Sequence, residues 1–133
     1  VPEYDEFREA VVSLGIDESL VPTWCPTGFE PSETEIYSTR SSDIVYLTFT
    51  GESDYYFIFT ILRYSSEEYL QRTNFEKDST DVLQYSNGRQ TFYILSNIDT
   101  VTAVWSDGLT IVQITGNIPN DVLIDLIDSI GGA

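Results

Sequence analysis

Hydrophobic and polar positions alternate along most of the chain between residues 21 and 115, and this period of two predicts β-strands. We expect seven strands, at residues 30–38, 43–50, 55–64, 80–85, 90–95, 100–105 and 109–115. In the second strand, Val45, Leu47 and Phe49 share one face. The third strand is apolar or aromatic on both faces, which is typical of a central strand that is covered on both sides.

Turn residues separate several of these segments. Asn87-Gly88 and Asp107-Gly108 each predict a two-residue hairpin turn, because Asn, Asp and Gly tolerate the positive φ angles that such turns require. Residues 51–54 predict a further turn, and the last four strands should form an antiparallel meander. The pattern breaks at residues 65–77, where a helical turn through Glu68 to Gln71 predicts a crossover or flap.

The two ends of the chain change to helical periodicity. Residues 4–14 place Phe7, Ala10, Val11 and Leu14 on one side, and Gly15 follows where a helix would stop. Residues 119–130 begin at Pro119 and end before Gly131-Gly132. Their apolar side contains Val122, Leu123, Leu126, Ile127 and Ile130, and their polar side contains Asp121, Asp125 and Asp128.

These elements predict an α+β fold with a twisted antiparallel sheet of about six or seven strands and both terminal helices on one face. The 133 residues suit a single domain, with a helix and lead-in at 1–20, the sheet at 21–117 and the second helix at 118–133. The other sheet face is expected to be partly open, with aromatic residues that offer a concave surface to a peptide, glycan or lipid-like ligand.

The net charge of −16 narrows the choice of partners. Nine of the 22 acidic residues precede Ile36, with only Arg8 beside them, and no basic residue follows Arg89. Such a field repels nucleic acid and anionic lipid headgroups, so neither is an expected partner. Solubility is the simplest interpretation of the acidity, and the alternatives are binding of a divalent cation or of a basic partner surface.

The residue inventory excludes several kinds of chemistry. The chain has no histidine and only one cysteine, Cys25, which excludes Ser-His-Asp catalysis, histidine-based metal sites, internal disulfides and thiolate clusters. Cys25 is interpreted as a small hydrophobic residue. The acidic segments Asp17-Glu18 and Glu33-Thr34-Glu35 lack the spacing of a calcium loop and are interpreted as solvated surface. We therefore expect no catalytic, cofactor or metal site.

Aromatic residues supply the candidate binding surface. We select Tyr55, Tyr56, Tyr64, Tyr93 and Trp105 as candidates for a ligand or partner surface; Tyr69 and Tyr85 belong to the wider set. A structural role for most of these tyrosines is the simpler interpretation. Trp105 in particular is expected to anchor the last hairpin in the core or at its edge.

Two stretches resemble a known family. The first is Val21-Pro22-Thr23-Trp24-Cys25-Pro26-Thr27-Gly28-Phe29, with the pattern P-x-W-x-P-x-G followed by Phe or Tyr. The second is Thr102-Ala103-Val104-Trp105-Ser106-Asp107-Gly108, followed by Ile114-Thr115-Gly116-Asn117 and a closing helix. In order and spacing they resemble the bacterial domain-of-unknown-function family 4367 over residues 21–130. Cys25 and Pro119 depart from the residues usual at those positions, without consequence for the fold.

The resemblance implies an extracytoplasmic domain of a Gram-positive Firmicutes protein, of the kind that follows a single transmembrane helix in proteins similar to anti-sigma factors. It supplies no catalytic residues. It also marks Trp24, Pro26, Gly28, Asp107 and Gly108 as a structural motif. We expect Trp24 to plug the open side of the sheet, the prolines to stiffen the crossing segment and Gly28 to permit the turn into the first strand.

The expected function is therefore a non-enzymatic sensor or interaction domain of a membrane-anchored regulatory protein, with a protein, small-molecule or glycan ligand. The chain contains no methionine, so we interpret it as part of a longer or processed protein, attached to a membrane only through a segment outside it. Two alternatives stay open: a secreted module that binds a small ligand, a glycan or a peptide, and a small carboxylate-dependent hydrolase with two buried acids in one cleft.

Overall fold

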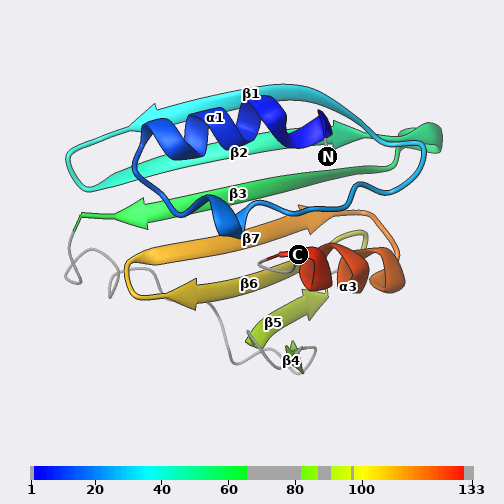
Figure 1. Cartoon of the computed structure of the whole chain (residues 1–133). Helices are drawn as coiled ribbons and strands as arrows, with labels where there is room; N and C mark the ends of the chain where they lie inside the picture. The colour runs from blue at the N-terminus through cyan, green and yellow to red at the C-terminus, as the bar shows by residue number, and fades with distance from the viewer. Residues whose placement is uncertain (1, 66–81, 87–90, 97, 131–133) are drawn as a thin grey trace.

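The computed structural model describes residues 2–65, 82–86, 91–96 and 98–130, and for Val82 and Asp107 it describes only the backbone. These residues form a single antiparallel sheet with helices on one of its faces (Figure 1). Four sequence features lie outside the described residues: Tyr69, the predicted helical turn at Glu68 to Gln71, the Asn87-Gly88 turn and the Gly131-Gly132 stop.

Seven strands form the sheet, and each differs from its predicted bounds by at most two residues. They are β1 (Glu30–Ser38), β2 (Ser42–Thr50), β3 (Tyr56–Tyr64), β4 (Val82–Ser86), β5 (Thr91–Ser96), β6 (Val101–Asp107) and β7 (Thr110–Gly116). Their order is β1-β2-β3-β7-β6-β5-β4, with every pair antiparallel. The predicted meander β4–β7 is confirmed, and β3 lies inside the sheet between β2 and β7.

This order consists of two meanders, β1–β2–β3 and β4–β5–β6–β7, which meet only where β3 pairs with β7. That pairing sets Phe57 opposite Gly116 and Arg63 opposite Thr110. We refer to the β3–β7 pairing as the seam, because it joins strands that are distant in the sequence.

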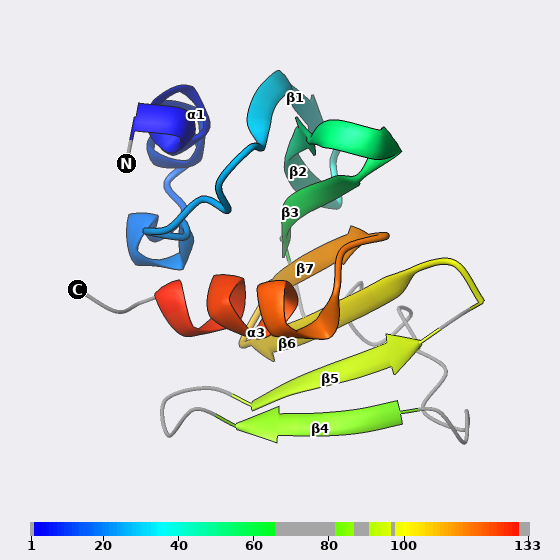
Figure 2. The same cartoon turned by 90° about the vertical axis from the view of Figure 1, so that its right-hand side faces the viewer.

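The helices lie on the same face of the sheet, as predicted (Figure 2). They are η1 (Pro2–Tyr4), α1 (Asp5–Ser13), η2 (Glu18–Leu20) and α3 (Asn120–Ser129). A further short helical turn, η3 (Glu52–Asp54), lies in the β2–β3 connection and contributes nothing to the core. Helix α1 packs against β1 and β2, and it lies in front of these strands in Figure 1. Helix α3 is joined to the opposite edge by a hydrogen bond of 2.7 Å that the Tyr85 hydroxyl in β4 donates to Asp128 Oδ1. Gly15, with φ +74°, ends the first helical segment.

One hydrophobic core fills the space between the helices and the sheet face that they cover, which we call the helix face. Tyr4 and Phe7 bring aromatic rings from the N-terminus to Phe49 and Phe59, with ring centroids 5.2 and 5.5 Å apart. The other fully enclosed side chains come from α1, from alternate positions of the strands, and from α3 with the residue that follows it. Among them are Val11, Val45, Phe57, Ile61, Phe92, Ala103, Val112, Ile114, Leu123, Leu126, Ile127 and Ile130. No helix among the described residues is long and apolar enough to cross a membrane.

The crossing segment around Trp24 also lies on the helix face, between α1 and α3 (Figure 2). The Tyr4 hydroxyl donates a hydrogen bond of 2.9 Å to the Trp24 carbonyl, and Thr23 exchanges two hydrogen bonds with Ser129 at the end of α3. The expectation that Trp24 plugs the open side of the sheet is therefore wrong. Its ring packs against the same core as the helices, because the two helices leave space between them that this segment fills.

The last hairpin turn is one residue away from its predicted place. Asp107 pairs with Thr110 as the end of β6, so the two residues of the turn are Gly108 and Leu109. Gly108 has a φ of +57°, which suits glycine at the first position of a two-residue turn. The register of the pairing, rather than the Asp-Gly pair itself, selects the turn.

Asn117 follows β7 and holds the loop between β2 and β3. Its Oδ1 accepts a hydrogen bond of 2.8 Å from the Tyr56 amide, and its Nδ2 donates one of 3.0 Å to the Asp54 carbonyl. This loop contains Ser53 and Asp54, both with positive φ angles (57° and 64°) that are uncommon for residues other than glycine. The Gly116-Asn117 pair therefore belongs to the framework, in which it fixes a strained loop to the seam.

Candidate functional site

The sheet face remote from the helices, here called the far face, is lined by alternate residues of all seven strands. The registers align them in rows across the sheet. One row runs Glu35, Tyr46, Thr60, Gln113, Val104, Tyr93 and Gln84, and the row beside it runs Tyr37, Ile44, Leu62, Ile111 and Ser106. Among the described residues no helix covers this face (Figure 2). The far face is thus a mixed surface of hydroxyl, aromatic and aliphatic groups.

Exposure varies strongly along this face. Ile111 and Val104 are buried, with only 1% and 5% of their surface exposed, whereas Tyr37 on β1 is 52% exposed. The hydroxyl groups of Thr102 and Thr115, also on this face, form a hydrogen bond of 3.2 Å with each other. The described part of the far face is therefore most accessible at its two ends, since Gln84 and Tyr93 at the β4–β5 end are exposed as well. Of these two ends, the β1–β2 end carries a cluster of interacting side chains.

Four side chains at this end form what we call the tyrosine–glutamate patch: Glu33, Glu35 and Tyr37 of β1 and Tyr46 of β2. The rings of Tyr37 and Tyr46 stack, with centroids 5.7 Å apart and planes inclined by 22°. The Tyr37 hydroxyl donates a hydrogen bond of 3.1 Å to Glu35 Oε2, and Tyr46, directly opposite Glu35 in the register, donates another to the same carboxylate. The patch therefore presents two stacked rings beside an ordered carboxylate.

The two glutamates of the patch differ in their pKa values although they lie two residues apart. Hydrogen bonds from Tyr46, from Glu33 and from Tyr37 lower the pKa of Glu35, which is thereby held ionised. The hydrogen bond shared with Glu35, and the negative charge of Glu35, raise the pKa of Glu33. The hydrogen bond to Glu35 also raises the pKa of Tyr46. Glu35 therefore ionises at a lower pH than Glu33, and the patch is acidic.

We expect Glu33 to titrate at a higher pH than an isolated glutamate, and we expect Glu35→Gln to lower its midpoint towards the ordinary value. The reason is that the substitution removes the negative charge that favours the protonated form of Glu33 and replaces the carboxylate acceptor by a weaker, neutral amide oxygen. Because the pKa of Glu33 is raised in the folded state, Glu33 adds to the free energy of unfolding at low pH, and this contribution is lost as the pH rises through the folded-state pKa. Because the pKa of Glu35 is lowered, Glu35 adds to the free energy of unfolding at higher pH, and this contribution is lost as the pH falls. Carboxyl carbon chemical shifts followed by NMR against pH give both midpoints.

Asp121→Asn is the matched control for this titration, because it removes one carboxylate from the polar side of α3, on the other face of the sheet. It should leave the Glu33 midpoint in place. An unchanged Glu33 midpoint in Glu35→Gln would contradict the coupling between the two groups.

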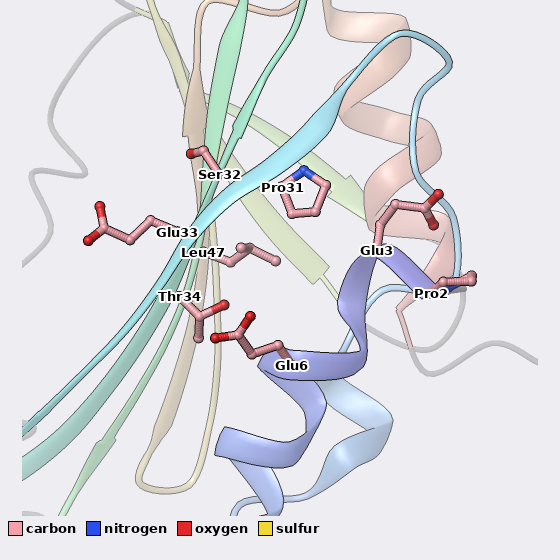
Figure 3. A pocket seen from close by; sticks show the side chains of 8 residues that line it. All are labelled: Pro2, Glu3, Glu6, Pro31, Ser32, Glu33, Thr34 and Leu47. Atoms are coloured by element: carbon pink, nitrogen blue, oxygen red, sulfur yellow. The ribbon is translucent and has the colours of Figure 1, made fainter.

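A cavity of about 310 Å³ lies on the helix side of the same strand, between the N-terminus and β1 (Figure 3). Its lining includes Glu3 and Glu6 from the N-terminal helical segment, Pro31 and Thr34 from β1, and Leu47 from β2. Glu33 also contributes to the lining, but its carboxylate points away from the helices, towards the far face (Figure 3). Strand β1 therefore separates two acidic features, the patch on the far face and the cavity on the helix face.

The five aromatic residues selected from the sequence do not form one surface. Tyr56, Tyr64 and Tyr93 lie on the far face, on β3 and β5. Tyr55 is 45% exposed and lies in the loop before β3. Trp105 lies on the helix face, where it packs against the core and stacks on Phe92 with centroids 6.2 Å apart. The interpretation of Trp105 as an anchor of its hairpin is confirmed, and its place beside the tyrosines in a single ligand surface is wrong.

Sequence reasoning missed the residues of the patch. Glu33 and Glu35 were interpreted as solvated surface, and Tyr37 and Tyr46 were not selected. The available signal was their alternation: Glu33, Glu35 and Tyr37 occupy every second position of a predicted strand, so they must share one face. Their proximity to Tyr46 depends on the β1–β2 register, which the sequence does not give.

The described residues offer neither a cluster of metal ligands nor a reactive thiol. No group of three or more potential ligands among these residues is arranged to hold a metal ion. Burial, and to a smaller extent Glu3, raises the pKa of the Cys25 thiol to about 11, so the reactive thiolate is scarce at neutral pH. The thiol lies 3.7 Å from the carbonyl oxygens of Pro26 and Phe29, which fits the interpretation of Cys25 as a packing residue.

Comparison with known families gives one match: the family described as a domain of unknown function, DUF4367, matches residues 19–130. No curated protein matches the chain. The matched region contains the whole sheet and α3, whereas α1 precedes it. Helix α1 is nevertheless part of the same core, through Phe7 and Val11.

Proposed function

The chain belongs to DUF4367, a family of domains of unknown function, and from this premise we propose that it is a non-enzymatic interaction domain. In this proposal the β1–β2 end of the far face binds a partner, and α1 on the other side of the same strands responds. The domain would act as an extracytoplasmic sensor in a membrane-anchored regulatory protein.

One observation carries this proposal: the tyrosine–glutamate patch and α1 lie on opposite faces of the same two strands. Tyr46 faces the patch, and its chain neighbour Leu47 faces the core, where only 2% of its surface is exposed. Phe49, two residues further, contacts Tyr4 at the start of α1. A partner that shifts or orders β1 and β2 therefore acts on residues in direct contact with the N-terminal helix.

The location outside the membrane, in Firmicutes proteins similar to anti-sigma factors, rests on the resemblance described above. It would place α1 between an anchoring segment and the sheet, which suits a helix that reports binding. The second candidate function, a secreted module that binds a glycan or a peptide, uses the same patch. Stacked tyrosine rings beside an ordered carboxylate are suited to either kind of ligand.

A carboxylate-dependent hydrolase has less support. The separated pKa values of Glu33 and Glu35 have the form seen in acid–base pairs. However, catalysis by such a pair requires a cleft that excludes water and positions the substrate, and these two side chains lie on the far face of an edge strand. We therefore favour binding over catalysis at this position.

The location is tested by thiol labelling of the full-length protein in intact cells. Glu52→Cys adds an exposed thiol in the β2–β3 loop, and we expect a membrane-impermeant maleimide to label it from outside. The parent protein is the control, because Cys25 is partly buried and scarcely ionised at neutral pH. Labelling that occurs only after the cells are broken would overturn the extracytoplasmic location.

The interaction is tested by photo-crosslinking of the same full-length protein. A photoreactive amino acid in place of Tyr37 or Tyr46 should give a discrete crosslinked product, and one in place of Asp121 on α3 should not. Products formed equally from all three positions, or from none of them, would overturn the assignment of the binding surface.

A further inference from the structure

We propose that the partner of this domain is a basic polypeptide segment that adds as an extended strand to the outer edge of β1. The inference rests on the proposed function and names the chemistry of the partner. Two observations support it independently: the geometry of an open strand edge, and the distribution of negative charge around that edge.

Strand β1 is the first in the sheet order, and no described strand pairs with its outer edge. The Thr39 amide donates a hydrogen bond of 2.8 Å to the Ser42 carbonyl at the β1–β2 turn, which identifies this pair as a hydrogen-bonded one. Hydrogen-bonded and non-hydrogen-bonded pairs alternate along an antiparallel ladder. The backbone amide and carbonyl groups of Thr34, Ile36 and Ser38 therefore point outward, as required for adding a strand.

The usable part of this edge has a definite beginning. Pro31 has no amide hydrogen, and the register is shifted between Pro31 and Glu33, so the first residues of β1 are protected against pairing in the usual ways. Beyond the shift, the strand is regular to Ser38. Its exposed apolar groups lie there too, since Ile36 and Tyr37 are 47% and 52% exposed.

The charge around this edge selects the partner. Glu33 and Glu35 flank the edge on the far face, and Glu3 and Glu6 lie at the cavity on the helix face. The two ion pairs within the described part of the chain, Arg8–Asp5 and Arg63–Asp43, involve none of these four carboxylates. With a net charge of −16, a second copy of the chain is repelled from this edge, and a cationic strand is attracted.

The alternation of faces specifies the pattern of the incoming strand. Every second side chain would lie on the far face, beside Glu33, Glu35 and the ring of Tyr37, where a lysine or arginine gains a carboxylate and a cation–π contact. The side chains between them would lie over Ile36 on the helix face, where an apolar group fits. The predicted partner therefore alternates basic and apolar residues.

The probe for this inference is an acetylated and amidated peptide of about eight residues in which lysine and valine alternate. Titrated into the isotopically labelled domain, it should shift the amide NMR signals of residues 33–38, and its affinity should fall as salt rises. A peptide alternating glutamate and valine, and one with the lysines and valines in separate blocks, are the controls and should bind at least about tenfold more weakly.

Ile36→Pro tests the edge geometry, because it removes an outward amide without breaking a bond to β2. We expect at least about a tenfold loss of affinity while the spectrum of the remainder of the domain is retained. The double variant Glu33→Gln/Glu35→Gln tests the charge, and Asp121→Asn/Asp125→Asn on α3 is its control with an equal change of net charge. Only the first pair of substitutions should weaken binding.

Equal binding of the block peptide, unchanged affinity in Ile36→Pro, or shifts centred on another surface would overturn this inference, as would dimerisation of the domain through β1. None of these results bears on the crosslinking experiment at Tyr37 and Tyr46. A crosslinked partner together with a failed peptide titration would mean that the surface is right and the mode of docking is wrong.

Discussion

Gly116→Ala should lower the free energy of unfolding by about 3 kcal/mol, which is a large effect for the addition of one methyl group. A Cβ atom at this position would overlap the Tyr56 carbonyl oxygen and would lie 2.8 Å from the Cα and Cβ atoms of Phe57. These are atoms of the neighbouring strand β3, mostly backbone, so they cannot move aside without separating the seam. Chemical denaturation of the purified domain measures the change.

Gly108→Asn provides the comparison for this prediction. Gly108 has a positive φ, but nothing lies within 4 Å of a Cβ atom placed there, and asparagine tolerates that backbone conformation. We expect a change of less than about 1 kcal/mol, as for most exposed substitutions. A similar loss in both variants would mean that the backbone freedom of glycine, rather than contact across the seam, determines the effect.

Phe57→Ala should destabilise the domain by about 3–5 kcal/mol, the range found when a buried aromatic residue is truncated. Phe57 is completely buried, stacks on Phe49 with centroids 4.6 Å apart and planes inclined by 7°, and contacts Phe29 at 5.4 Å. The alanine variant would leave a cavity opposite Gly116, where no side chain is available to fill it. Thermal unfolding followed by circular dichroism would show a strongly lowered midpoint.

Phe57→Leu separates volume from ring contacts. Leucine retains most of the buried apolar surface but loses the stacking on Phe49, so it should cost clearly less than alanine. If leucine and alanine were equally destabilising, the contribution of Phe57 to stability would come from its aromatic contacts. The filling of the space next to Gly116 would then contribute little.

Most of the secondary structure follows from alternation in the sequence, because the inner strands bury one face against the helices. The alternation of Val45, Leu47 and Phe49 predicted the strand and their shared face correctly, and the structure buries that face in the core. The order of the strands does not follow in this way, since the seam pairs residues as distant as Phe57 and Gly116 and no local pattern encodes such a contact. The one-residue shift of the Gly108 turn has a similar origin, in the pairing of β6 with β7.

The candidate site shows what alternation can and cannot provide. Trp105 occupies an alternate position of β6 together with Val101 and Ala103, so the sequence alone could have placed it on the helix face. The patch required more information. Glu35 and Tyr46 meet only because the β1–β2 register sets them opposite each other, and the pKa values of the pair depend on that contact.

The seam also has a consequence for the order of events in folding. Within each meander, strands that are neighbours in the sequence pair through short connections, and such contacts form quickly. The seam has to close a much longer loop, so its formation carries the largest entropic cost and should limit the folding rate. If the two meanders form first and closure of the seam limits the rate, then Gly116→Ala, which acts at the seam, should mainly slow refolding and should change the unfolding rate less.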